Sequence, residues 1–276
     1  MAYTYLNSKG KLSVNTWECF KAAVEDINLF DCAISDILQR AEDTARSEGP
    51  DITTAAFANA RGSWYEWVVA LGAIRWMREH PESLTMCNLP NVSSYDCSRL
   101  YDAKISFYID DLRKKARESS NVELISSNPD FVLVSSQLGR DLPTREQIAA
   151  STSSDIINGI YQQFHQRCDL DDLLGYASVK TSFRPDRRLQ IPHEGSLFKA
   201  LYRHIQTRDW LVDAPGISYY AVTQKANDKD FRALNTVATH SITDVSSKPL
   251  AAVDELFVVT DGLSLTQMLE SVLGGS

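Results

Sequence analysis

Several features that would mark other classes of protein are missing from this 276-residue sequence. Its longest apolar run extends only over residues 67–74, far short of the ~20 residues that a helix needs to cross a bilayer. The first residues lack the apolar core of a signal peptide. The five cysteines form no CxxC pair, and the five histidines form neither HxH nor HExxH. We therefore expect a cytoplasmic protein with reduced thiols, no membrane partner and no zinc site.

Positive charge is also scarce, with 28 lysines and arginines against 36 acids and a net charge of −8. This balance argues against a general nucleic-acid binder, because DNA affinity depends largely on neutralising phosphates. One segment differs from the rest. Residues 180–208 carry seven lysines and arginines and two acids, a local charge of +5. Since only local charge acts on a ligand, we expect DNA or another anion to bind along this segment.

The apolar pattern predicts an α/β protein. No repeat or linker divides the chain, so we expect one domain over 1–276, with a helical N-terminal part over 1–80 and a core over 81–276. Strands interleaved with helices favour a layered α/β architecture. The spacing predicts helices over 15–47, 62–80, 98–118, 145–166 and 193–207 and in the tail from 250, and strands over 122–126, 131–135, 176–183 and 217–224.

The first candidate for chemistry is an aspartate. Three Pro-Asp pairs occur, at residues 50–51, 129–130 and 185–186, and each is typical of a turn. Asp130 differs from the other two because it stands at the entry of an apolar strand. Its carboxylate can therefore be presented at the edge of a sheet.

A lysine and a second acid complete the set. Ser178 and Lys180 lie on the same face of their predicted strand. A lysine in an apolar strand needs an acidic or phosphate partner, because an unpaired buried ammonium is costly; an exposed edge lysine is the alternative. Glu194 opens the next predicted helix, where the helix dipole favours an acid, so capping is its alternative role. With Asp130, these groups have the chemistry of a Mg²⁺-dependent phosphodiesterase, in which hard oxygens hold the ion and a lysine offsets developing charge.

This set resembles the active site of a PD-(D/E)XK nuclease in its permuted form. The usual second acid is replaced by Ser178, two residues before Lys180, and a carboxylate appears instead at Glu194. That displacement is similar to the one in type II restriction endonucleases that cut sites with a CCGG core, the relatives of NgoMIV and of the R/CCGGY cutters. The segments that resemble the family are SVKTSFRPDRRLQIPHEGSLFKALYRH, ARGSWYEW, SNPDFVLV and TVATHSITDV.

The resemblance implies a restriction-endonuclease-like fold, with a mixed central sheet flanked by helices, and a bacterial source. It implies Mg²⁺ as the cofactor. Glu66, flanked by aromatic residues, would support the metal site; an ordinary exposed helix acid is the alternative. The implied catalytic residues are Asp130, Lys180, Glu194, Glu66 and Ser178, and the implied metal ligands are Asp130, Glu194 and the carbonyl of Val179.

The resemblance also assigns DNA contacts. In the major groove an arginine can bond bidentately to guanine and an aspartate can accept from cytosine, so the loop RPDRR would read half of CCGG. A solvated charged turn is the alternative for this loop, and a helix cap is the alternative for Asn59. The implied base readers are Arg184, Asp186, Arg187 and Asn59, and the implied phosphate contacts are Arg188, for which a structural contact is the alternative, and Arg61.

The expected function is that of a type II restriction endonuclease that cleaves double-stranded DNA at R/CCGGY and leaves 5′-CCGG overhangs. A palindromic site requires a two-fold partner, and the resemblance implies a homotetramer, a dimer of dimers, rather than a dimer. A cognate methyltransferase would protect host DNA. A repair-type nuclease of the same fold, or a DNA-binding module without catalysis, is the alternative; the presence of Asp130, Lys180 and Glu194 argues against the second.

Overall fold

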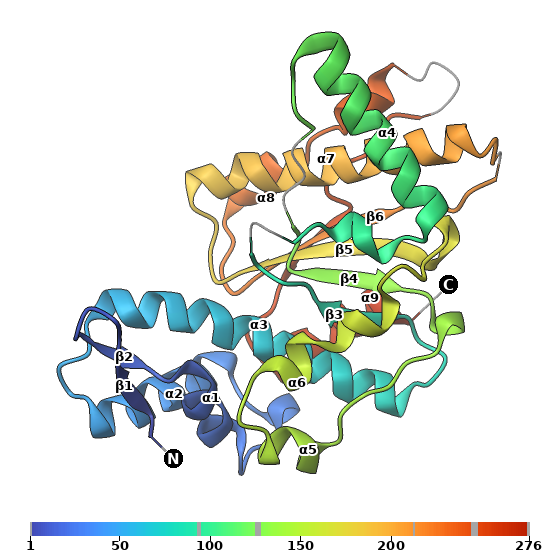
Figure 1. Ribbon diagram of the computed structural model, residues 1–276. Helices are drawn as coiled ribbons and strands as arrows, with labels where there is room; N and C mark the ends of the chain where they lie inside the picture. The colour runs from blue at the N-terminus through green and yellow to red at the C-terminus, as the bar shows by residue number, and fades with distance from the viewer. Residues whose placement is uncertain (1, 93–94, 125–127, 212, 244–247, 275–276) are drawn as a thin grey trace.

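A five-stranded mixed sheet forms the centre of the molecule (Figure 1). The structure is a computed structural model that describes residues 2–92, 95–124, 128–211, 213–243 and 248–274. The strand order is β3-β4-β5-β6-β7; β3, β4 and β5 pair antiparallel, and β5, β6 and β7 pair parallel. The bounds are β3 Thr85–Asn88, β4 Phe131–Val134, β5 Leu173–Lys180, β6 Ser218–Thr223 and β7 Glu255–Val258. The predicted α/β class with a mixed central sheet is confirmed.

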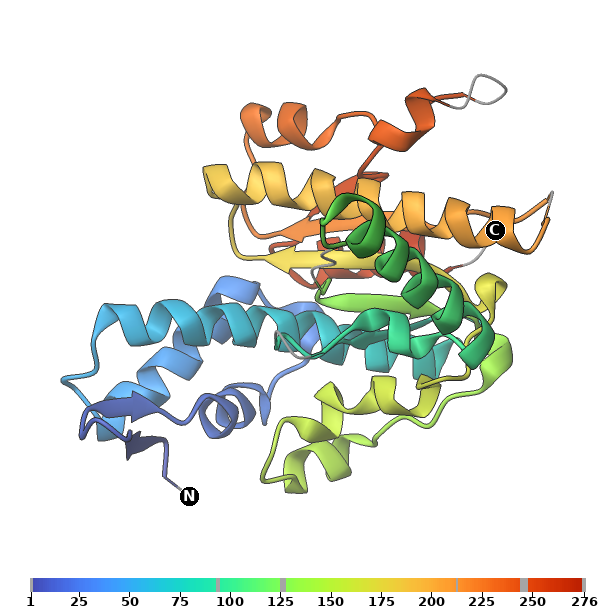
Figure 2. The ribbon, with the colours of Figure 1, turned by 45° about the horizontal axis from the view of Figure 1, so that its top comes forward.

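Long helices cover both faces of this sheet. Helix α3 (Thr54–Glu79) packs on β3 and β5 and against α9 (Gly262–Leu273). Helix α7 (Pro185–Arg208) packs on β6 and against α4 (Ala103–Ser120). Figure 2 shows α7 and α3 on opposite sides of the sheet. The carboxyl ends of β5 and β6 therefore lie between two helices that come from distant parts of the sequence.

The N-terminal residues form a small layer against the first half of α3 (Figure 1). Its elements are β1 (Thr4–Leu6), β2 (Leu12–Val14), α1 (Thr16–Val24) and α2 (Ile34–Glu48). Three short helices and six 3₁₀ turns complete the described residues: α5 Arg145–Ala150, α6 Asp155–Asn158, α8 Asp228–Leu234, and turns at Leu29–Asp31, Cys97–Leu100, Ser136–Leu138, Ile160–Phe164, Leu170–Asp172 and Thr239–Ile242.

Two predicted helices are interrupted. The helix predicted over 15–47 breaks between α1 and α2, where the Asn28 side chain accepts a hydrogen bond from the Phe30 amide and starts a 3₁₀ turn. The helix predicted over 145–166 is three short pieces, because α5 already ends at Ala150, before a run of small polar residues. Such residues hydrogen-bond to nearby backbone and so compete with a helix.

The strand predictions fail mainly at the margins of the sheet. Residues 122–124 form no strand, and the rest of that predicted strand, with Ser127, lies outside the described residues. The four-residue strands β3 and β7 were missed, whereas the equally short β4 was predicted because its four residues form an unbroken apolar run. The tail from Leu250 is therefore not mostly helical: β7 precedes α9.

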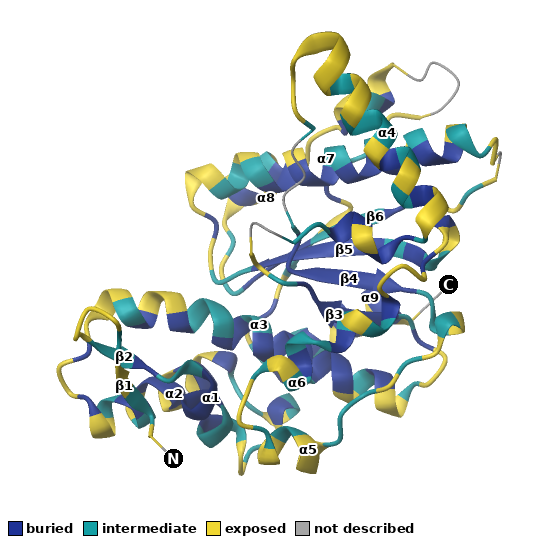
Figure 3. Cartoon of the chain, viewed as in Figure 1, coloured by how far each residue is buried: buried dark blue, intermediate teal, exposed yellow. Residues whose placement is uncertain are grey.

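The core lies between the sheet and its helices, where Figure 3 shows buried residues on both sides of β4, β5 and β6. Trp64 and Tyr65 of α3 are fully buried, so these aromatic residues belong to the core and offer no surface for base stacking. All five cysteines are free thiols. Within the described residues, no helix is long and apolar enough to span a bilayer.

Candidate active site

The pairing of β4 with β5 determines where Asp130 lies. Phe131 is opposite Ala177 in this antiparallel pair, and the Asp130 amide donates to the Ala177 carbonyl at 3.1 Å. One step further along the register, Asp130 lies beside Ser178, near the carboxyl end of β5. Two segments almost 50 residues apart in the sequence thus place the Asp130 carboxylate beside β5, the strand that ends in Lys180.

The Asp130 carboxylate is held from several directions. Lys180 Nζ lies 2.7 Å from Oδ1 and 2.6 Å from Oδ2, and the Val179 amide donates to Oδ2 at 2.6 Å. Ser178 Oγ lies 3.3 Å from the same oxygen. Asp130 is 5% exposed, so its charge needs this pairing to be tolerated. The sequence prediction that Lys180 has an acidic partner is correct.

Glu66 approaches the same pair from the opposite helix. The neighbouring Tyr65 hydroxyl donates to the Val259 carbonyl at 3.1 Å, which ties α3 to the residue after β7. Burial, and then the negative charge of Asp130, raise the pKa of Glu66 from 4.5 to about 8, although the Lys180 ammonium opposes this shift. Glu66 is therefore not an ordinary exposed helix acid, because it is electrostatically coupled to both members of the Asp130–Lys180 pair.

Glu194 does not open a helix. Helix α7 begins at Pro185, and Glu194 lies in its third turn with 3% of its surface exposed. The predicted start at 193 was wrong because Pro192 lies inside the helix, a position that proline rarely occupies. Capping is therefore excluded as its role. One Glu194 oxygen accepts from Gln190 Nε2 at 2.5 Å and the other from the Tyr219 hydroxyl at 2.6 Å.

A close approach of α7 to the chain before β7 makes the Tyr219 contact possible. A Cβ atom at Gly195 would lie 2.1 Å from the Ala252 carbonyl oxygen, so no other residue fits there. Burial, then the charge of Glu194 and its hydrogen bond, and then the charge of Asp130 raise the pKa of Tyr219 far above its usual value. One buried hydroxyl is thus influenced by both carboxylates, and we call Asp130, Glu66 and Glu194 the acidic site.

The RPDRR segment forms the start of α7. The predicted loop was wrong: Arg184 is the N-cap residue and Pro185 takes the first helical position, where its missing N–H costs nothing. Arg184 and Asp186 are exposed and form an ion pair at 3.1 Å. Arg187 Nη1 donates to Gln190 Oε1 at 2.6 Å. The predicted base readers of this segment therefore follow Lys180 by four to seven residues, at the start of α7.

The oxygen donors of this site suit a hard cation such as Mg²⁺. Asp130 and Glu66 are close enough for one charge to raise the pKa of the other acid, and a divalent cation would relieve that repulsion. Both Glu194 oxygens accept one hydrogen bond each and retain lone pairs. Among the described residues, however, no three acidic, histidine or cysteine side chains already form a cluster that could hold one ion.

Comparison with known proteins identifies the family. The model of the Cfr10I/Bse634I restriction endonuclease family matches residues 3–274. The chain belongs to this family. It is 38% identical over 275 residues to the type II restriction enzyme Cfr10I of Citrobacter freundii, covering 95% of each chain. It also resembles two solved structures of the Bse634I restriction endonuclease, one with cognate DNA (TM-score 0.82, 27% identity) and a second one (TM-score 0.85, 28% identity). The match covers 98% of this chain and 96% of each of theirs.

Membership of the Cfr10I/Bse634I family confirms the predicted enzyme class. The protein is a type II restriction endonuclease. The relation to NgoMIV, the recognition site and the roles of individual residues remain predictions. The helices on both faces of the sheet and the mixed strand order agree with the fold of the Bse634I structures.

Of the remaining predicted DNA contacts of this restriction endonuclease, Arg188 and Arg61 already have protein partners. Arg188 Nε lies 2.5 Å from Asp230, which is almost fully buried, so the structural alternative for Arg188 has direct support. Arg61 pairs with Glu42 at 2.6 Å. Asn59 is exposed two turns before Glu66 on α3. Thr53 rather than Asn59 caps α3, so the capping alternative for Asn59 is wrong.

The cationic segment 180–208 does not form a single basic face. Five of its seven lysines and arginines pair with aspartates, and Lys199 is buried against Asp254. These ion pairs offset much of the local charge of +5 that this segment carries in the sequence, and DNA binding along it stays a prediction. Within this segment, Lys180 contacts Asp130 directly, and Arg184 and Arg187 begin α7.

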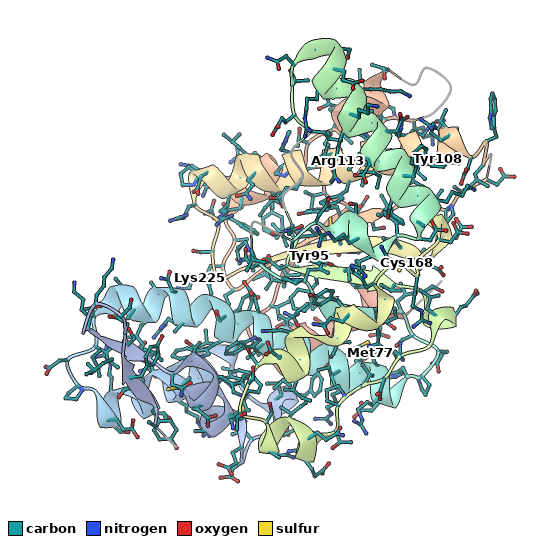
Figure 4. The ribbon with its side chains drawn as sticks, viewed as in Figure 1. Met77, Tyr95, Tyr108, Arg113, Cys168 and Lys225 are labelled. Carbon is teal, nitrogen blue, oxygen red and sulfur yellow. The ribbon has the colours of Figure 1, made fainter. Side chains whose placement is uncertain are left out.

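Three residues that the sequence did not point to also belong to this region. Tyr219 was interpreted only as part of a strand, and Gln190 lay between the predicted RPDRR loop and the helix predicted from residue 193. Lys225 is exposed just after β6, whose residue Thr223 is opposite Lys180. Figure 4 shows Lys225 beyond the carboxyl ends of β5 and β6. No local sequence signal marks these residues, because each depends on contacts or pairing that only the fold creates.

The raised pKa of Glu66 predicts a pH-dependent stability. Because the pKa of Glu66 is higher in the folded than in the unfolded protein, protonated Glu66 contributes its full stability below the pKa that it has in the unfolded chain. This contribution to the free energy of unfolding is lost as pH rises through about 8. We therefore expect Glu66→Gln, which does not titrate, to raise the Tm of metal-free protein more at about pH 9 than at about pH 5. Melting curves in chelator measure this. Glu79→Gln, an exposed acid of the same helix, should show no such difference; equal shifts at both pH values for Glu66→Gln would contradict the assignment.

Proposed function

We propose that this restriction endonuclease hydrolyses double-stranded DNA with Mg²⁺ at a palindromic site with a CCGG core, R/CCGGY, leaving 5′-CCGG overhangs with 5′-phosphate and 3′-hydroxyl ends. One observation carries the proposal: the Asp130–Lys180 pair is electrostatically coupled to Glu66, and the exposed Arg184 and half-buried Arg187 follow Lys180 at the start of α7. The relative named Cfr10I is a type II restriction enzyme, and a similar solved structure contains cognate DNA.

The catalytic roles follow from the contacts around Asp130. Asp130, Glu194 and the Val179 carbonyl would hold the metal, with Glu66 in support; a bound Mg²⁺ would supply an activated water and offset the phosphate charge. Lys180 orients the attacking water and offsets charge that develops on the phosphate. Ser178, with its hydroxyl 3.3 Å from Asp130, helps to keep that carboxylate in place.

Base recognition is assigned to the first turn of α7. Arg184 and Arg187 pair bidentately with guanines and Asp186 accepts from cytosine, while Asn59 of α3 reads the outer base pair. These side chains come from the helices on either side of the acidic site. Arg188 and Arg61 keep unused N–H donors beyond their ion pairs, which is how they contact phosphates without losing those partners.

The experiment that tests this proposal uses two duplexes that differ only in the CCGG core. We expect cleavage of the RCCGGY duplex with Mg²⁺ and no cleavage with chelator or of the duplex with a scrambled core. A cognate methyltransferase that modifies the core would protect the first duplex. Equal cleavage of both duplexes would contradict the site, and cleavage in chelator would contradict the metal.

The assembly is proposed to be a homotetramer built as a dimer of dimers. Trp210 is 89% exposed just after α7, with a backbone φ of 56°. A core role for Trp210 is thereby excluded, and an exposed tryptophan is a typical interface anchor.

We expect Trp210→Ala to shift the mass measured by light scattering from tetramer to dimer. Leu263→Ala, which removes an exposed leucine of α9, is the control and should leave the tetramer intact. A tetramer of Trp210→Ala at the same concentrations would exclude this anchor.

A further inference from the structure

A chain of side-chain hydrogen bonds runs along the first turns of α7. Arg187 Nη1 donates to Gln190 Oε1 at 2.6 Å, and Gln190 Nε2 donates to Glu194 Oε1 at 2.5 Å. The three residues are three and four positions apart, so they follow one another on one face of the helix. The chain thus connects a candidate base reader with a carboxylate of the acidic site.

The chemistry of this chain requires an amide in the middle. A guanidinium can only donate hydrogen bonds and an ionised carboxylate can only accept them, whereas an amide does both. The two contacts therefore also fix the orientation of the Gln190 amide. Gln190 is partly exposed, so burial of its side chain alone does not explain why a glutamine occupies this position. Its two hydrogen bonds, to Arg187 and to Glu194, do.

We propose that Gln190 is a positioning residue that couples reading of guanine by Arg187 to the placement of Glu194. The coupling rests on the proposed function of this site. Arg187 uses Nη1 for Gln190, which leaves its Nε–Nη2 edge for a bidentate bond to guanine. With the correct base, Arg187 holds Gln190, and Gln190 holds Glu194. A wrong base displaces the guanidinium and thereby weakens the hydrogen bond to Glu194.

The second contact of Glu194 shows why the effect of a wrong base reaches Glu194 through Gln190. Its second oxygen is held by the Tyr219 hydroxyl, which is fully buried on β6 and cannot respond to DNA. Of the two described contacts of Glu194, the one through Gln190 leads toward the exposed start of α7. A mismatch at the base read by Arg187 therefore slows the cleavage step in addition to weakening binding.

The test separates these two effects. Single-turnover rate constants for cleavage are measured at saturating enzyme on two duplexes, the cognate one and one in which the guanine read by Arg187 is replaced. The Kd of the enzyme for each duplex is measured separately in Ca²⁺. In Gln190→Met, which keeps length but not hydrogen bonds, we expect the cognate rate constant to fall about ten- to a hundredfold. The cognate-to-mismatch ratio of rate constants should fall toward one, while the ratio of Kd values stays as in the wild type.

Two further variants identify the cause. Gln206→Met removes the matching amide of the Arg203–Gln206 contact at 2.7 Å, at the other end of α7, and should leave the mismatch ratio unchanged. Gln190→Glu can accept from Arg187 but cannot donate to Glu194, so it should keep cognate affinity and lose cleavage. If the wild-type protein cleaves at CCGG and Gln190→Met has the same cognate-to-mismatch ratio of rate constants as the wild type, the coupling is overturned and the proposed function stays intact. No cleavage at CCGG by the wild type overturns both.

Discussion

Replacing Asp130 with asparagine should lower the single-turnover cleavage rate constant by about a thousandfold or more while DNA binding remains. Asp130 accepts hydrogen bonds from the Lys180 ammonium and the Val179 amide. An asparagine at this position keeps the shape of the side chain but removes the charge that holds both Lys180 and a metal. The loss therefore falls on the chemical step.

A matched control is available for this variant. Asp51 also follows a proline but is exposed and lies far from β5 in the sequence, so Asp51→Asn should cleave like the wild type. Binding is followed with a labelled CCGG duplex in Ca²⁺, and cleavage is followed after adding Mg²⁺. Cleavage by Asp130→Asn within tenfold of the wild-type rate would show that Asp130 is not a catalytic carboxylate.

The second large effect concerns sequence recognition. Arg184 is exposed and pairs with Asp186, an ion pair that costs little to rearrange because it lies in solvent. Both side chains are therefore available to bases. We expect Arg184→Ala to weaken binding to a CCGG duplex by about ten- to a hundredfold and to change binding to an unrelated duplex only slightly.

The comparison of two duplexes distinguishes base reading from phosphate contact. Arg232→Ala removes an exposed cation on α8 whose Nε donates to the Asp228 carbonyl. It serves as the control and should preserve the preference for CCGG. If Arg184→Ala weakens both duplexes equally, Arg184 contacts phosphates and the assignment to guanine is wrong.

The acid–lysine pair could be found from sequence because its signal is local. Asp130 stands at the start of an apolar run, and Lys180 ends one, so each marks a strand end. The residue pairing that joins them, Phe131 with Ala177, is not visible in the sequence. It depends on register, which is set by burial of both strands within the sheet.

The surroundings of Glu194 could not be predicted, because they depend on tertiary contacts. Pro192 indicates a helix boundary, yet α7 continues through it. The approach that Gly195 permits brings Tyr219 of another element to the carboxylate. In the same way, the buried Asp230 that pairs with Arg188 comes from α8, more than 40 residues later. Charge counted along the sequence therefore overstated the basic surface of α7.

The most direct test of the central claim is to digest a large unmethylated plasmid with the wild-type protein and Mg²⁺ and to sequence every fragment end. We expect all ends to begin 5′-CCGG with a purine–pyrimidine outer pair, and no ends from Asp130→Asn. Ends with a CCGG core but a single fixed outer pair would contradict the role of Asn59 alone. Ends without a common CCGG core would contradict the assignment of Arg184, Asp186 and Arg187 and with it the proposed function.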